Sequence, residues 1–181
     1  SVGRDLQGLT LGVLGLGTLG ARVARYGRAF DMQVLGYSRS LTEEKARALD
    51  ITAVSGLSEM SRMADIISIH LPLTPQTRGM IGKAELAAMK KGVILLNTSR
   101  GPIVDEAALI DALQSGQVGA AGLDVFDVEP LPATHPFRSI KTVHATPHLG
   151  YVTENSYRAF FNGAIEAITA FLDGKPIREL A

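Results

Sequence analysis

Short apolar segments alternate along this chain with longer segments of helical period, and this alternation constrains the fold more than any other feature. The segments of strand length cover residues 11–14, 33–37, 52–54, 66–69, 93–97, 120–125 and 142–145. Several are apolar throughout, which is typical of strands that helices cover on both faces. The pattern predicts repeated βαβ units and a doubly wound parallel sheet of the α/β class.

Start and stop signals mark the predicted helices. Three polar residues precede acidic first turns and are predicted to cap helix N-termini, namely Thr42, Ser58 and Asp105. A last helix is expected from Thr153 towards Leu172, with Gly174 as its stop signal. Residues 126–141 contain three prolines and are therefore expected to be irregular.

Composition argues against several classes of protein. The 181 residues carry 18 Lys and Arg against 18 Asp and Glu, so the basic surface that binds nucleic acid is not expected. No apolar run has the roughly 18 residues of a membrane span, and no signal-peptide core opens the chain. The sequence has no Cys, which excludes disulfides and a thiol nucleophile. We expect a cytoplasmic protein without nucleic-acid or membrane partners.

A glycine motif follows the first expected strand and opens the first helix. The residues Gly15-Leu16-Gly17-Thr18-Leu19-Gly20 match GxGxxG. In such a motif Gly15 permits a tight turn, Gly17 lets backbone approach a pyrophosphate, and Gly20 lets the helix pack closely. The helix N-terminus offers free N–H groups to phosphates. A tight turn without a ligand is the alternative, but the βαβ context favours dinucleotide binding.

The end of the second strand bears on the choice of dinucleotide. NAD-preferring sites place an Asp or Glu there to accept hydrogen bonds from the ribose hydroxyls. This sequence instead has Ser38, Arg39 and Ser40, which can donate to a 2′-phosphate. NADP is therefore favoured over NAD. In the alternative, Arg39 is a solvated surface residue and the cofactor is NAD.

An Arg, a carboxylate and a His follow three later strands, at the edge where open α/β sheets bind their ligands. Arg100 follows the fifth strand, Glu129 lies beyond the sixth, and His148 follows the seventh. Arg is a planar two-pronged donor for a carboxylate, and His can transfer a proton near neutral pH. A carboxylate bonded to such a His would fix its tautomer. Taken singly, Arg100 could cap backbone carbonyls and Glu129 could be an ordinary loop carboxylate.

Five motifs follow one another along the chain: the glycine motif from Leu11, His70-Leu71-Pro72-Leu73-Thr74-Pro75, Asn97-Thr98-Ser99-Arg100-Gly101, residues 124–130, and Thr146-Pro147-His148. In this order they resemble the cofactor domain of the D-isomer-specific 2-hydroxyacid dehydrogenases. The resemblance covers nearly the whole chain. It implies a Rossmann-type dinucleotide-binding domain and hydride transfer between a nicotinamide cofactor and a D-2-hydroxy or 2-keto acid.

The resemblance also assigns residue roles. Arg100 would bind the substrate, His148 would be the acid/base, and Glu129 would be the partner of His148. Contacts to the cofactor would come from Gly15, Gly17, Thr18, Leu19, Gly20, Ser38, Arg39, Ser40, His70, Pro72, Thr98, Asp124 and Gly150. Ser38 stands where the family usually has an acidic residue. No metal site is expected, and His135 and His144 are interpreted as structural or surface residues.

The position of the glycine motif bears on domain organisation. A complete member of the family has most of its substrate domain before this motif, which here begins at Gly15. We expect a dinucleotide-binding domain over residues 1–152, and a helix and tail over 153–181 that would return to a largely absent substrate domain. Tyr157, Phe160 and Phe161 would then form an exposed apolar patch.

Two functions follow from these expectations. The first is an NAD(P)-dependent D-2-hydroxyacid dehydrogenase acting on a small 2-keto acid, of which this isolated domain would turn over substrate poorly. The family commonly pairs through its cofactor domains, so a homodimer is expected. The alternative is a dinucleotide-sensing interaction module, similar to the transcriptional corepressors related to this family.

Overall fold

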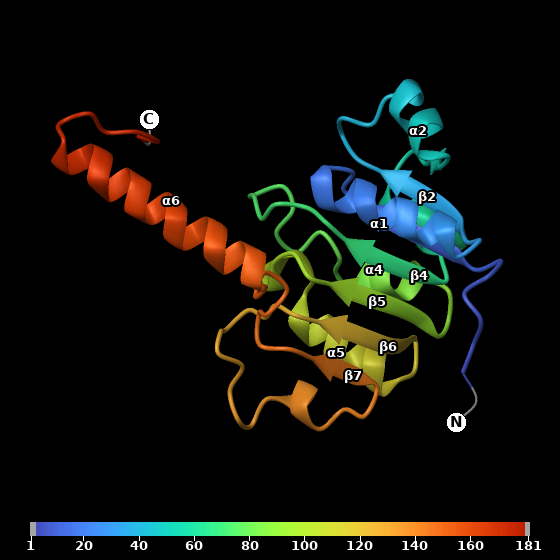
Figure 1. Ribbon diagram of the computed structural model, residues 1–181. Coiled ribbons are helices and arrows are strands. Elements are labelled where there is room, and N and C mark those ends of the chain that lie inside the picture. Colours follow the sequence, from blue (N-terminus) through green and yellow to red (C-terminus); the bar gives the residue numbers. More distant parts are fainter. Residues whose placement is uncertain (1–2, 180–181) are drawn as a thin grey trace. The chain divides into compact units, whose positions relative to one another are not determined.

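The computed structural model describes residues 3–179 and contains one parallel sheet (Figure 1). The strands run in the order β3-β2-β1-β4-β5-β6-β7, and every neighbouring pair is parallel. Their bounds are β1 Thr10–Leu14, β2 Gln33–Tyr37, β3 Thr52–Ala53, β4 Ile66–Ile69, β5 Val93–Asn97, β6 Val118–Leu123 and β7 Val143–Ala145.

An α-helix connects each strand from β1 to β5 to the strand that follows it in the chain. These helices are α1 Thr18–Ala29, α2 Glu43–Leu49, α3 Leu57–Met63, α4 Lys83–Ala88 and α5 Glu106–Gln114, with α6 Glu154–Leu172 after β7. Two short 3₁₀ turns, Gly101–Ile103 and Pro136–Arg138, lie in the later connections. Figure 1 shows α1 in front of the sheet and α4 and α5 behind it.

Buried side chains from opposite faces of the sheet form two apolar clusters. On one face, Val13 and Val34 pack with Ala24 of α1 and Leu49 of α2. On the other face, the buried strand residues pack with residues of α3, α4 and α5, among them Leu14, Leu35, Ile67, Leu95, Met60, Leu86 and Leu109. Because neighbouring strand residues point to opposite faces, a strand covered on both sides must be apolar throughout. The predicted doubly wound Rossmann-type fold is confirmed.

The bounds of the strands follow the sequence prediction closely. Residues 33–37, 66–69 and 93–97 form β2, β4 and β5 as predicted. The sixth strand was expected over 120–125 but occupies Val118–Leu123, a correction that has a simple cause. Its pairing with β5 begins at Val93 opposite Val118, with a register irregularity after Val93. The apolar residues beyond Leu123 pack into the core without belonging to the strand.

Two of the three predicted caps are present. The Thr42 hydroxyl accepts from the Lys45 N–H, and the Asp105 carboxylate accepts from the Ala108 N–H. The prediction for Ser58 is wrong, because α3 begins at Leu57 and its N-cap is Gly56. The carboxylate of Glu59 accepts instead from the N–H and hydroxyl of Ser55, before the helix.

The order in which the chain adds strands to the sheet reverses at β1. From this central strand the chain proceeds first to β2 and β3 on one side, then to β4 through β7 on the other. Connections leaving the carboxyl ends of β1 and β4 therefore diverge to opposite sides, which leaves a crevice between them. The glycine motif lies at this switch point.

The described residues divide into two compact units, one ending at Pro147 and the other beginning at His148. The second unit contains α6, which begins after the N-cap Thr153 and ends before Gly174, as predicted. No residue of α6 is buried, and Tyr157, Phe160 and Phe161 are exposed as expected. The tail returns to α6, where Arg178 donates to the Gly163 carbonyl and pairs with Glu166.

Candidate dinucleotide and substrate site

The glycine motif forms a close-fitting turn with one open side. Gly15 has a φ of 96°, in the left-handed region that favours glycine, and its N–H donates to the Tyr37 carbonyl over 2.8 Å. A Cβ on Gly15 would overlap the carbonyl of His70. Gly17 is the N-cap of α1, and no atom lies within 4 Å of the position that its Cβ would take. Backbone N–H groups are thus accessible to a pyrophosphate over Gly17.

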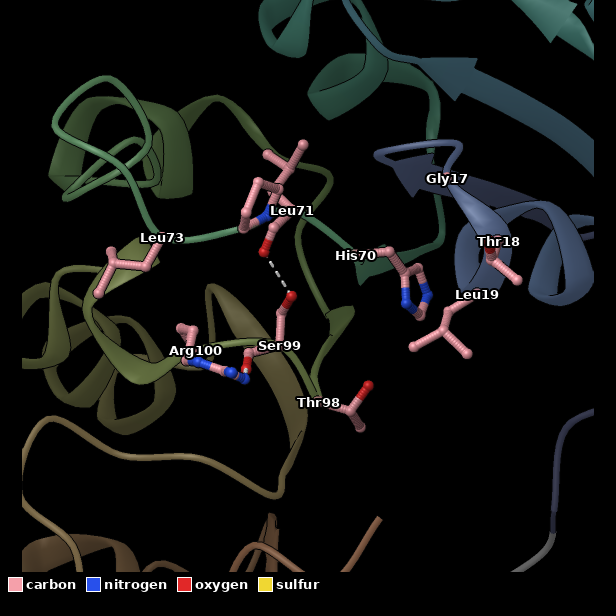
Figure 2. Close-up of a pocket in the computed structure, with 10 residues that line it drawn as sticks. Gly17, Thr18, Leu19, His70, Leu71, Leu73, Thr98, Ser99 and Arg100 are labelled. Atoms are coloured by element: carbon pink, nitrogen blue, oxygen red, sulfur yellow. Dashed lines mark hydrogen bonds between the residues drawn. The ribbon is translucent and has the colours of Figure 1, made fainter. Parts of the chain in front are cut away.

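An open pocket of about 460 Å³ lies beside this turn (Figure 2). Its lining comes from the turn and from the carboxyl ends of β4 and β5, and consists of Gly17, Thr18, Leu19, His70, Leu71, Pro72, Leu73, Thr98, Ser99 and Arg100. In the view of Figure 2, Leu19 and Arg100 lie on opposite sides with Thr98 between them. Predicted cofactor residues and the predicted substrate-binding arginine therefore share one pocket.

A second pocket of about 660 Å³ continues towards β2. It shares four residues with the first and adds the segment after β2; its lining is Gly15, Leu16, Gly17, Tyr37, Ser38, Arg39, Ser40, His70, Leu71, Pro72, Gln76, Thr77 and Met80. The hydroxyls of Ser38 and Ser40 are 3.4 Å apart. No Asp or Glu is among these lining residues, so the pocket contains hydroxyl and guanidinium donors without a carboxylate.

His70 lies between the two pockets and lines both. Its Nε2 is 2.8 Å from the hydroxyl of Ser68, a buried residue in β4. Burial lowers the pKa of His70 below its usual value. The side chain is therefore a neutral imidazole at pH 7, suited to contact with an uncharged part of a ligand.

The turn after β5 presents Arg100. Asn97, a buried residue, accepts from the Ser99 N–H and donates through its amide to the Arg100 carbonyl, over 3.0 and 2.9 Å. The Ser99 hydroxyl donates to the Leu71 carbonyl over 2.6 Å, which joins this turn to the segment after β4. One Arg100 N–H donates to the Ser99 carbonyl, and the exposed guanidinium has further N–H donors.

Asp124 and Glu129 lie on the connection after β6 and line neither pocket. Asp124 is buried, and its carboxylate accepts from the Thr146 hydroxyl over 2.5 Å. Glu129 is exposed, and its carboxylate accepts from the Phe126 N–H over 3.0 Å. The Glu129 side chain is thus tied to the backbone at the start of the irregular segment.

His135 stabilises the same irregular segment. Its Nδ1 accepts from the Phe137 N–H, so Nε2 carries the proton and donates to Glu106 over 2.9 Å. Burial, with the neighbouring Glu106 carboxylate, raises the pKa of Asp127. His135 thus makes structural contacts, one of the two roles expected for it, and exposed His144 lies in β7.

The remaining predicted residues, His148 and Gly150, belong to the second unit. His148 has a φ of 56°, and its ring meets that of Tyr151 edge-on at 6.1 Å between centroids. Gly150 is exposed.

Sequence reasoning missed several lining residues, which are Leu16, Tyr37, Leu71, Leu73, Gln76, Thr77, Met80 and Ser99. Most lie just beyond β4, where a turn is built by Thr77. Its hydroxyl donates to the Pro72 carbonyl over 2.7 Å and accepts from the Thr74 N–H over 2.8 Å. The Thr74-Pro75 dipeptide is a sequence signal for such a turn. Because the segment follows a parallel strand, it is also expected at the carboxyl edge of the sheet, where ligands bind.

Residues 3–179 contain no group of three or more His, Asp or Glu able to hold a metal ion. Within the same part of the chain, no helix has the length and apolar character needed to cross a bilayer.

A doubly wound parallel sheet with a glycine turn at its switch point and an open pocket alongside defines a dinucleotide-binding domain. The comparison with family models is specific about which one. Residues 1–150 match the NAD binding domain of the D-isomer specific 2-hydroxyacid dehydrogenases, and the chain belongs to that family.

Individual relatives agree with this assignment. A glyoxylate reductase of Aeropyrum pernix is 45% identical over 174 residues, which are 96% of this chain and 52% of that protein. A D-3-phosphoglycerate dehydrogenase of Methanocaldococcus jannaschii is 40% identical over 96% of this chain and 33% of its own length. The chain thus spans between a third and about half of these relatives.

Solved structures show the same fold. The crystal structure of D-lactate dehydrogenase from Aquifex aeolicus, complexed with NAD and lactic acid, superposes with a TM-score of 0.86 at 36% identity. The match covers 96% of this chain and 56% of that one.

Proposed function

We propose that this chain is the cofactor-binding part of an oxidoreductase that transfers hydride between a nicotinamide dinucleotide and a D-2-hydroxy or 2-keto acid. The observation that carries the proposal is the pocket lined by Gly17, His70 and Arg100, because it joins a phosphate-binding turn to a carboxylate-binding guanidinium. The named activities of the relatives agree with this reaction class.

The turn residues fit a dinucleotide. Gly17 leaves the space that a pyrophosphate needs, and the free N–H groups at the start of α1 would donate to a phosphate there. Thr18, Leu19, His70, Pro72 and Thr98 would line the rest of the cofactor. A bound nicotinamide supplies the hydride that the reaction transfers.

Arg100 would hold the substrate. Its guanidinium is exposed to the pocket and has N–H donors beyond the one that caps the Ser99 carbonyl. Two parallel N–H donors match a carboxylate and would orient a 2-keto acid for attack at near-contact distance. Asn97 and Ser99 fix the backbone from which Arg100 extends.

His148 would protonate the oxygen of the reduced substrate, with Glu129 holding its imidazole in the required tautomer. Asp124 and Gly150 would contact the bound cofactor, Asp124 on its nicotinamide side.

The proposed domain division has the dinucleotide-binding part over residues 1–152 and a helix and tail over 153–181 that would return to the substrate domain. A homodimer in the cytoplasm is the proposed working state.

Of the two dinucleotides, we favour NADP. The pocket beyond β2 is lined by Ser38, Arg39 and Ser40 and has no lining carboxylate to repel a 2′-phosphate. NAD, with Arg39 in solvent, is the competing choice.

Calorimetric titration and thermal unfolding with NAD, NADH, NADP and NADPH test the proposal. Ligand at one hundred times its dissociation constant adds about 2.7 kcal/mol to the free energy of unfolding. Stabilisation by the dinucleotides supports the cofactor site, and its absence with all four contradicts it. Larger shifts with the phosphorylated pair support NADP.

Reduction of glyoxylate and hydroxypyruvate, followed by loss of NADPH or NADH absorbance, tests the activity. We expect slow turnover by these 181 residues alone, because the relatives are up to three times as long. In the catalytically competent protein, His148→Asn should abolish reduction while dinucleotide affinity is kept. If a competent protein binds dinucleotide, reduces no 2-keto acid, and changes partner affinity instead, it is a sensor.

A further inference from the structure

Lys45 of α2 extends its side chain to the glycine turn. Its ammonium donates to the backbone carbonyl of Leu16 over 2.6 Å, and the side chain is half-buried. Leu16 lies between the first two glycines of the motif and lines the pocket beyond β2. A cation is therefore held against a residue that shares this pocket with Ser38, Arg39 and Ser40.

The first turn of α2 is an electrostatically unfavourable position for the Lys45 ammonium. Free N–H groups at a helix N-terminus carry positive partial charge and favour Asp or Glu, as at Glu43 and Glu44 of the same turn. Neither acid pairs with Lys45, which has no ion-pair partner within residues 3–179. The neutral Leu16 carbonyl takes one of the three N–H donors of the ammonium and leaves its charge uncompensated.

Arg39 also has a positive charge that no acidic side chain among the described residues compensates. Its guanidinium makes no hydrogen bond or ion pair within the part of the chain that the structure describes. The Ser38 and Ser40 hydroxyls face each other at 3.4 Å. Ser38, Arg39 and Ser40 thus line a pocket that no carboxylate lines, and the Lys45 ammonium is bonded to Leu16, another residue of the same lining.

We propose that Lys45 is a specificity-determining residue for the 2′-phosphate of the dinucleotide, acting as a second cation beside Arg39. The inference rests on the proposed NADP preference and adds the residue that would enforce it. A phosphate monoester is close to a dianion at neutral pH, so one guanidinium leaves part of its charge unmatched. Lys45 can supply the rest with its remaining N–H donors while the bond to Leu16 fixes its position.

The test uses fragments that contain only the adenosine end of the cofactor. Calorimetric titration with 2′,5′-ADP and with 5′-AMP isolates the 2′-phosphate from nicotinamide binding. Lys45→Met should weaken 2′,5′-ADP binding about tenfold or more, as expected for one charge-assisted hydrogen bond, and change 5′-AMP binding less than about twofold. Lys45→Arg should keep most of the preference for 2′,5′-ADP.

Arg47→Gln is the matched control, because it removes one positive charge from an exposed position of the same helix. It should leave both affinities within about twofold of the parent, since exposed charges are screened by salt. An equal loss in Arg47→Gln and Lys45→Met would overturn the proposal in favour of a general charge effect.

The outcomes separate this inference from the proposed cofactor choice. If the parent chain binds 2′,5′-ADP no better than 5′-AMP, both the NADP proposal and the role of Lys45 are wrong. If the parent prefers 2′,5′-ADP and Lys45→Met keeps that preference, only the role of Lys45 is wrong. Should Lys45→Met unfold, the side-chain resonances of Lys45 in the parent decide: 2′,5′-ADP should shift them and 5′-AMP should not.

Discussion

The carbonyl oxygen of Gly15 occupies the space that a Cβ atom on Gly20 would need. Helix α1 can approach the turn this closely only because Gly20 has no side chain. We therefore expect Gly20→Ala to destabilise the fold by about 3 kcal/mol or more, because backbone cannot move aside as a flexible side chain can. Urea unfolding followed by circular dichroism measures the change.

Gly17→Ala is the contrasting variant within the same motif. No atom lies within 4 Å of its Cβ position, and its φ of −71° is accessible to alanine. The variant should lose less than about 1 kcal/mol, through the poorer N-cap alone. Its affinity for dinucleotides should nevertheless fall at least about tenfold, because the methyl group enters the pyrophosphate space. Unchanged affinity in a folded Gly17→Ala protein would refute that location for the phosphates.

Two caps give a prediction about local stability. Asp105→Ala removes the acceptor for the Ala108 N–H and should cost about 1 kcal/mol. Ser58→Ala should cost less than about 0.5 kcal/mol, since Ser58 lies inside α3 and is exposed. Equal losses in the two variants, measured by urea unfolding, would contradict the assignment of Gly56 as the N-cap of α3.

The lowered pKa of His70 predicts how stability responds to mild acid. The usual pKa of 6.5 applies to the unfolded chain, and burial lowers it in the folded protein. Between these two values the unfolded chain binds more protons, so this contribution is complete above pH 6.5 and is lost as pH falls through the folded pKa. His70→Gln should reduce the slope of unfolding free energy against pH over this window. An unaltered slope would show that His70 is not the group responsible.

Asp65 gives the corresponding prediction at lower pH. Burial alone would raise its pKa, but the Thr10 N–H and the Lys90 ammonium outweigh burial and lower the pKa below 3.8. Its contribution is present above pH 3.8 and is lost as pH falls through the folded pKa. Asp65→Asn should cost about 1 to 2 kcal/mol at pH 7 and progressively less in acid. Lys90→Met should cost less, because Lys90 is the more exposed partner. A constant deficit for Asp65→Asn at every pH would rule out its charge as the cause.

The fold was largely predictable because its main signals are local. An apolar run such as 66–69 must be covered on both faces, and the GxGxxG spacing fixes where the first helix begins. The cap at Ser58 was mispredicted because Ser55 and Gly56 offer a competing start, which Glu59 stabilises from inside the helix. Local sequence contained both starts, and the Glu59 hydrogen bonds favour the earlier one.

The candidate site was only partly predictable, because its remaining residues depend on contacts between distant segments. Ser99 is fixed by the Leu71 carbonyl, and Lys45 reaches Leu16 from the next helix. No spacing rule connects these pairs. Residues on the glycine motif and at strand ends were accessible to sequence reasoning because topology alone brings strand ends to one edge.

Asp65 joins β1, β4 and β5 at their amino ends, away from the pockets. Its carboxylate accepts from the Thr10 N–H, its N–H donates to the Thr10 carbonyl, and its carbonyl accepts from the Ile94 N–H. The stabilising contacts of Asp65 and the residues proposed to select the dinucleotide thus lie at opposite ends of the sheet's strands. We therefore expect that substitutions after β2 can alter which dinucleotide is bound while the Asp65 contacts are kept.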